Sequence, residues 1–313
     1  MKQLISLSFC LFIFVNLSSC SQTNEEEIKE GISAANQALT ERRCDAALDI
    51  LGGIGYQGKN PRYLQVYASA WGCKANFSEI TFFASDLPNI TVGTSSLFGA
   101  LSTLTTSSDF TTVSDSIYQN LQNGIDALLF AGDINQSSHE NRLGEFSFSE
   151  VNNMNVQALY MIIVQMGRFF NFYGNSGAAG AKGTGVGAST CYLDYLGNAL
   201  ALASVGAGQT GLCTGAGQQH PDLEANIALK CQGIVLFNNF IDIVLNVSFT
   251  GGSSGDLGDL ATKFADVCTD VALGNVSAAL CGTTATKTQS SCVGLPIADI
   301  EVYYAWLFER MHQ

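Results

Sequence analysis

Apolar residues recur at three- and four-residue spacing along most of this chain, and this spacing is typical of helices that bury one face. Ile28, Ile32, Ala35 and Leu39 mark the first such stretch. A second stretch over residues 46–51 stops at Gly52 and Gly53, which are residues that end helices. The pattern predicts an all-α fold built from antiparallel helical hairpins, followed by a disulfide-stabilised helical bundle.

Further helices are expected downstream. Asn60 and Pro61 form an N-cap followed by proline in the first turn, so a helix should begin there. Residues 156–173 are apolar nearly all round except for Gln157, Gln165, Arg168 and Asn171, which predicts a central buried helix with one polar stripe. Other helical stretches are expected at residues 77–87, 117–129, 227–247, 257–273 and 296–311. In residues 227–247, four polar residues recur on one side and indicate an amphipathic helix: Asn238, Asn239, Asp242 and Asn246.

Residues 44–87 carry a pattern of small and large apolar residues. Ala47 and Ala68 are small enough for antiparallel helices to approach closely, and Leu64, Tyr67 and Trp71 would fill the space beside them. This segment resembles tetratricopeptide-type helical repeats. The match is partial, because Ile80 stands where the next repeat has a small residue, and a simple helical hairpin explains the same residues.

The N-terminus has the order of an export signal. Lys2 precedes an apolar run that ends on Leu17, Ser18 and Ser19, directly before Cys20. This arrangement resembles the lipobox of bacterial lipoproteins, and the resemblance implies a diacylglycerol thioether and an acylated amine on Cys20. Because Ser21 is not aspartate, the family rule points to the periplasmic face of the outer membrane. The alternative is a plain secretory leader with an incidental cysteine.

The charge of the chain excludes some partners. The formal net charge is −13, whereas nucleic acid binding requires basic residues to pair with phosphates. Anionic lipid headgroups should also be repelled, so the membrane contact is expected through the acyl chains at Cys20. Charged residues make up 13% of the chain and hydrophobic residues 47%, so the composition is that of a folded protein and not of a disordered one.

An even number of cysteines follows Cys20, which in an exported chain favours disulfides. The spacing lacks a C-x-x-C pair, so zinc and thioredoxin-like sites have little support. Two of these cysteines lie early and the rest lie from residue 191 onward, which suggests that Cys44 pairs with Cys73 and that the later six pair among themselves. The disulfide candidates are Cys44, Cys73, Cys191, Cys213, Cys231, Cys268, Cys281 and Cys292.

Several short motifs suggest chemistry, but each has a simpler explanation. Residues 251–255 match G-x-S-x-G around Ser253, yet the downstream histidine would have to be His312, so a glycine- and serine-rich loop is favoured. Asp133, Asn135 and Ser137 imitate the start of a calcium loop that lacks its glycine and glutamate. Residues 180–184 have the wrong order for a phosphate loop. We expect no catalysis, no metal and no cofactor.

The expected organisation is a signal peptide (1–19), a lipidated tether (20–27), a repeat-like helical region (28–173), a glycine-rich linker (174–190) and a cysteine-containing helical region (191–313). The favoured hypothesis is a lipid-anchored scaffold that presents a groove to an envelope protein, with Tyr63, Tyr67 and Trp71 as groove candidates. The second hypothesis is a small-ligand carrier that resembles the helical lipoproteins of solute transporters. A hydrolase using Ser253 is the third.

Overall fold

The computed structural model describes residues 24–78, 113–174, 191–203, 211–213, 223–248, 279–281 and 285–310. Within these ranges the chain is all-α, apart from an isolated bridge between Tyr192 and Leu212. The chain divides into two compact units, Met1–Tyr56 and Gln57–Gln313. The expected boundary, the glycine-rich segment 174–190, lies outside the described residues except for Gly174.

The first unit is a helical hairpin. Helix α2 (Asn24–Thr40) packs against α3 (Cys44–Gly53), and α3 ends at the glycine pair as the sequence predicts. The approach is close at Gly31, where a Cβ atom would lie 2.7 Å from Cγ2 of Ile54. Small and aliphatic residues make up the buried positions of this hairpin: Ile32, Ala35, Ala38, Ala47 and Leu51.

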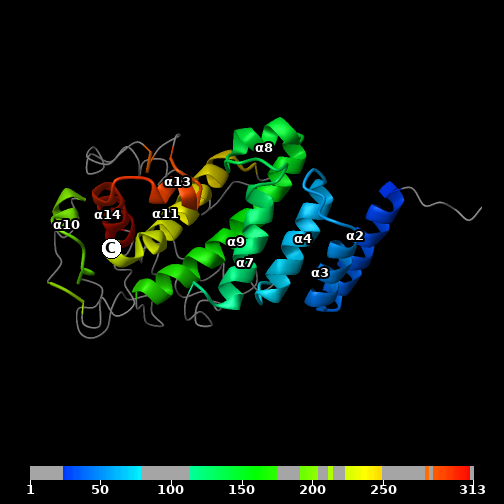
Figure 1. Ribbon diagram of the computed structural model, residues 1–313, viewed down its shortest axis with the longest axis horizontal. Helices are drawn as coiled ribbons and strands as arrows, with labels where there is room; N and C mark the ends of the chain where they lie inside the picture. The colour runs from blue at the N-terminus through cyan, green and yellow to red at the C-terminus, as the bar shows by residue number, and fades with distance from the viewer. Residues whose placement is uncertain are drawn as a thin grey trace, which may run out of the picture. The chain divides into compact units, whose positions relative to one another are not determined.

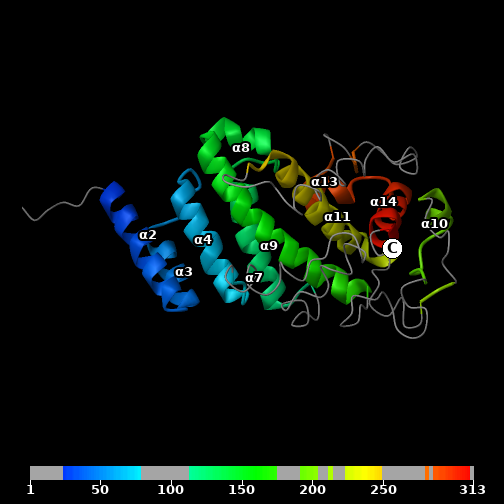
Figure 2. The same ribbon diagram turned by 180° about the vertical axis from the view of Figure 1, so that it is seen from behind.

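The second unit contains the remaining described helices. They are α4 (Pro61–Lys74), α7 (Ser116–Leu129), α8 (His139–Glu145), α9 (Phe148–Gly174), α10 (Ala199–Leu202), α11 (Leu223–Asn246), α13 (Gln289–Val293) and α14 (Ile297–Ala305), which continues as a π-helical turn (Trp306–Arg310). In both views α4, α7, α9 and α11 follow one another, and α13 lies beside α11 (Figures 1 and 2).

Helix α4 starts where the sequence predicts. The side chain of Asn60 accepts a hydrogen bond of 3.0 Å from the backbone N–H of Tyr63, and Pro61 follows in the first turn. Helix α4 packs against α7, where Gly124 permits close contact. A Cβ atom on Gly124 would lie 2.9 Å from the backbone oxygen of Ala68, so the two helices meet at small residues.

Helix α9 is the central helix, and Gln157, Gln165 and Arg168 of its predicted polar stripe are buried. Gln157 donates to the backbone oxygen of Gln65 at 3.1 Å and to the hydroxyl of Ser69 at 2.9 Å, both on α4. Arg168 donates to the oxygen of Ala75, which caps α4, at 2.8 Å. A guanidinium at the carbonyl end of a helix also interacts favourably with the helix dipole. The stripe therefore ties α9 to α4.

Helix α11 is long and apolar enough to cross a membrane by length and composition over Asn226–Asn246, but 61% of its most apolar window is buried inside the protein. It packs against α9, α13 and α14. The polar side that the sequence shows on this helix is buried in part: Asn238 and Asn239 are 4% and 1% exposed, Asp242 is half-buried and Asn246 is exposed. Helix α11 is therefore a core helix of the second unit.

The later cysteines pair among themselves where the structure describes them. Cys191 pairs with Cys213, and Cys231 on α11 pairs with Cys292 on α13. Cys44, Cys73 and Cys281 are also disulfide-bonded. Cys268 lies outside the described residues, as do residues 1–23, which include the predicted signal peptide and Cys20. The tetratricopeptide resemblance stays a prediction.

Candidate functional site

A cavity of about 510 Å³ lies in the second unit, between α7, α11 and the segment 287–290. Its lining combines apolar side chains, among them Leu129, Phe130 and Leu236, with amides, hydroxyls and two charged groups. A concave and mostly apolar surface with a few polar groups is typical of sites for small molecules. This cavity is the candidate functional site.

The helical repeat of 3.6 residues places these groups on common faces. On α7, Gln122, Asp126 and Leu129 are four and three residues apart and line the cavity together. On α11, Gln232, Leu236 and Asn239 follow the same steps. Both helices pack along α9, so α9 fixes the two faces that form the opposite walls.

Asp126 provides one of the two charged groups of the lining, and its carboxylate is half-buried. It accepts a hydrogen bond of 2.8 Å from the side-chain amide of Gln122. Burial raises the pKa of Asp126 from 3.8 to about 6, and the bond from Gln122 offsets this only in part. In the part of the chain that the structure describes, Asp126 has no ion-pair partner.

Replacing Asp126 by asparagine should raise the free energy of unfolding by about 2–3 kcal/mol at pH 8 and leave it nearly unchanged at pH 4. Because its pKa is raised, the carboxyl group of Asp126 keeps its proton in the folded chain at pH values where the unfolded chain has lost it. The charged carboxylate therefore destabilises the fold increasingly as pH rises from about 4 through 6. Urea unfolding at both pH values measures the difference.

The matched control is Asp194→Asn, an exposed acid of the same unit that does not line the cavity. It should change stability by less than about 0.5 kcal/mol at either pH. Tyr118 interacts electrostatically with Asp126, and burial raises the pKa of Tyr118 well above its usual value, so Tyr118 stays neutral between pH 4 and 8. An equal effect of Asp126→Asn on stability at both pH values would contradict the raised pKa of Asp126.

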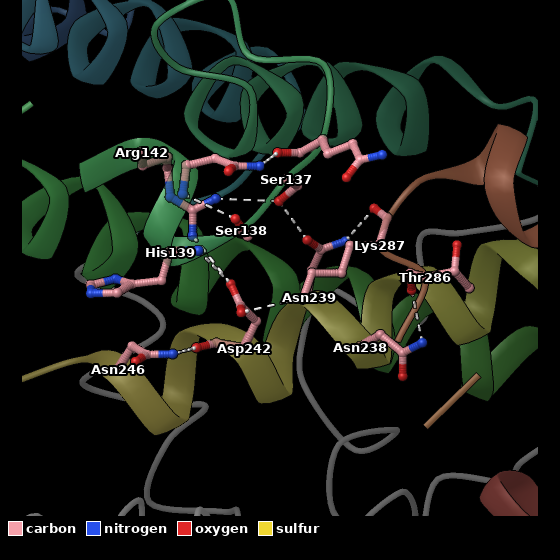
Figure 3. Close-up of polar contacts among 12 residues, drawn as sticks. Ser137, Ser138, His139, Arg142, Asn238, Asn239, Asp242, Asn246, Thr286 and Lys287 are labelled. Carbon is pink, nitrogen blue, oxygen red and sulfur yellow. Dashed lines mark hydrogen bonds and ion pairs between the residues drawn. The ribbon is translucent and has the colours of Figure 1, made fainter. Parts of the chain in front are cut away.

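A network of buried polar groups adjoins the other side of the cavity (Figure 3). Asp242 on α11 accepts from the backbone N–H of His139 at 2.9 Å, and forms ion pairs with Arg142 at 3.5 Å and Lys287 at 3.3 Å. Burial lowers the pKa of Arg142 to about 10, although Asp242 opposes the shift. The guanidinium therefore remains charged at neutral pH, and Asp242 neutralises part of the charge of both basic groups.

Arg142 also joins this network to α7. It donates to the backbone oxygen of Leu129 at 3.1 Å, to the hydroxyl of Ser137 at 3.2 Å and to the side-chain oxygen of Asn155 at 3.0 Å. Ser137 in turn donates to the side-chain oxygen of Asn239 at 2.7 Å. Helices α7, α8 and α9 are thus connected to α11 through buried polar contacts, in which Nη2 of Arg142 has the ion pair with Asp242 but no hydrogen bond.

Segment 287–290 is held against α11 by side-chain amides. Asn239 donates to the backbone oxygen of Lys287 at 2.9 Å, and Gln289 donates to the backbone oxygen of Ala228 at 2.6 Å (Figure 3 shows Asn239 and Lys287). Asn238 donates to the oxygen of Thr286 at 2.8 Å. Together with the Cys231–Cys292 disulfide, these bonds fix the third wall of the cavity.

A second cluster of buried charges lies away from the cavity and is satisfied internally. Lys230 pairs with Glu301, and their side chains are 1% and 2% exposed. The ammonium lies 5.4 Å from the ring centre of Tyr195, and Glu301 accepts from the backbone N–H of Leu196 at 2.7 Å. Glu309 accepts from the backbone N–H of Leu193 at 2.8 Å. This cluster connects residues 193–196 to α11, α14 and the π-helical turn.

The candidate residues predicted from the sequence lie partly in the core, partly at the cavity and partly outside the described residues. Tyr63 is 1% exposed, so its ring belongs to the core and does not line a groove, whereas Tyr67 and Trp71 are half-buried beside it. Of the imitation calcium loop, Asn135 lines the cavity and Ser137 belongs to the polar network. No metal-binding group occurs among the described residues. Ser253, His312 and residues 180–184 lie outside them.

Gln122, Asp126 and Lys287 were not predicted as site residues from the sequence. One signal was present, because Asp126 follows Ile125 and precedes Ala127 and Leu128 inside an otherwise apolar helix segment. An acid in that position is costly to bury unless it is paired or functional. Lys287 gives no comparable signal, since it lies in a polar stretch of threonine, glutamine and serine.

Comparison with known proteins gives no family for this chain. No family model matches it, and neither a curated protein nor a solved structure does.

Proposed function

We propose that this chain is a bacterial outer-membrane lipoprotein that binds a small molecule, without converting it, in the cavity between α7 and α11. The cavity carries the proposal, because its volume of about 510 Å³ and its mixed apolar and polar lining suit a small organic ligand. Its walls are fixed by hydrogen bonds and a disulfide, so little ordering is needed on binding.

The proposed location rests on two features of the chain. The lipobox Leu17–Cys20 predicts acylation of Cys20, and two or more acyl chains give lasting attachment to a bilayer. The disulfides of the helical body are typical of proteins exposed to an oxidising compartment such as the periplasm. A ligand-binding domain tethered at the periplasmic face accounts for both features.

The test is native mass spectrometry of the full chain extracted from membranes with mild detergent. We expect a polypeptide that begins at Cys20 and carries diacylglycerol and an acyl group, with a low-mass compound that is released on denaturation. Gln232→Trp should displace the bound compound, because the larger indole would occupy part of the cavity. Leu245→Trp is the matched control, since Leu245 lies on the same helix but is 52% exposed.

Three outcomes would contradict parts of the proposal. An unmodified N-terminus would rule out the lipid anchor, and equal ligand occupancy in both tryptophan variants would place the ligand elsewhere. Recovery of a stable envelope protein partner with an empty cavity would favour the scaffold hypothesis instead. Crosslinking in intact cells before extraction makes that partner visible, and its band should be absent if the cavity is the site of action.

A further inference from the structure

We infer that the ligand of this cavity carries a positively charged amine, which binds to the carboxylate of Asp126. The inference rests on the proposed function and adds the chemical class of the ligand. Its basis is the juxtaposition, within a single cavity, of an apolar wall and a carboxylate that has no cationic partner among the described residues.

The carboxylate of Asp126 is oriented for binding but not satisfied. It lines the cavity and, within the described ranges, accepts one hydrogen bond, from Gln122. Gln122 is itself fixed, because its side-chain oxygen accepts from Gln165 at 3.3 Å. An ionised carboxylate has room for about four hydrogen bonds, so most of its acceptor capacity remains for a donor that enters the cavity.

The charges around the cavity favour a cation over an anion. Lys287 is the basic side chain of the described lining, and it forms an ion pair with Asp242 at 3.3 Å and not with Asp126. Asp126 lies in the last turn of α7, whose carbonyl end carries partial negative charge. A half-buried carboxylate at that end has lost part of its hydration without gaining a counter-charge. A bound ammonium would supply the missing counter-charge.

The rest of the lining suits an apolar body behind the amine. Leu129 and Phe130 follow Asp126 on α7, and Val235 and Leu236 lie on the opposite wall. An amine attached to an aromatic or aliphatic group would contact these side chains while its ammonium reached Asp126. The cavity has room for a molecule of this size.

The test compares three probes of one shape and different charge: phenethylamine, 2-phenylethanol and phenylacetate. Titration calorimetry of the full chain at pH 8 should show the amine binding about tenfold or more tighter than the alcohol, with phenylacetate weakest. Asp126→Asn should reduce the preference for the amine over the alcohol to within about threefold. Asp194→Asn, the control, should leave all three affinities unchanged.

The outcomes separate this inference from the proposed function. Equal or tighter binding of the alcohol or the anion, abolished by Gln232→Trp, overturns the amine assignment and leaves the small-molecule site in place. Tight amine binding that survives Asp126→Asn also overturns the assignment. Failure of all three probes to bind, together with the absence of any compound in the native mass spectrum, overturns both.

Discussion

Replacing Lys230 by methionine should lower the free energy of unfolding by about 3–5 kcal/mol. Methionine is close to lysine in size, so the loss comes from the charge and not from a cavity. Removal of the ammonium leaves the carboxylate of Glu301, whose side chain is 2% exposed, without its counter-charge. Denaturant unfolding of the full chain at pH 7 measures the change.

A double-mutant cycle identifies the cause. Lys230→Met combined with Glu301→Gln removes both charges and keeps an oxygen to accept from the N–H of Leu196, so most of the lost stability should return. The matched control is Lys59→Met, which breaks an exposed pair with Glu145 and should cost less than about 1 kcal/mol. If the double variant is no more stable than Lys230→Met alone, the buried pair is not the source of the loss.

Removing the Cys231–Cys292 disulfide by serine substitution of both cysteines should lower the free energy of unfolding by about 4 kcal/mol. The bond closes a loop with a sequence separation of 61 residues, and the loss of this restraint increases the entropy of the unfolded chain. Because the bond also fixes α13 beside α11, ligand affinity should fall in the same variant. Denaturant unfolding and probe titration measure the two effects.

The second described disulfide is the control for loop length. Cys191–Cys213 has a sequence separation of 22 residues, so replacing both of its cysteines should cost about 3 kcal/mol by the same reasoning. These cysteines do not line the cavity, and the affinity for the amine probe should not change. A larger loss of stability from the shorter loop would show that native contacts, and not chain entropy, dominate both bonds.

Local patterns in the sequence predicted the local structure well. The cap at Asn60, the end of α3 at Gly53 and the buried polar stripe of α9 depend on residues a few positions apart, which periodicity and capping rules describe. The grouping of the cysteines also predicted that the pairs around Cys191 and Cys231 form among the later residues.

The candidate site could not be predicted in this way, because it depends on distant parts of the chain. Its walls come from residues near 126, near 232 and near 288, and no short pattern links them. The same limit applies to Lys230 and Glu301, which are 71 positions apart. The polar side of α11 was visible in the sequence, but the side-chain amide of an asparagine can bond to solvent or to a neighbouring backbone. The structure shows that the amide of Asn238 donates to the backbone oxygens of Leu280 and Thr286.

The buried side chains of α9 also restrict how this protein can change in length. Gln157 donates to a backbone oxygen near the middle of α4, and Arg168 donates to the backbone oxygen of Ala75 at the end of α4. The spacing of Gln157 and Arg168 along α9 therefore has to match the spacing of these two acceptors along α4. One inserted residue would rotate one of these side chains by about 100° relative to the other and leave a polar group buried without its partner. Insertions and deletions should therefore be tolerated in the connecting segments and rejected between residues 157 and 168.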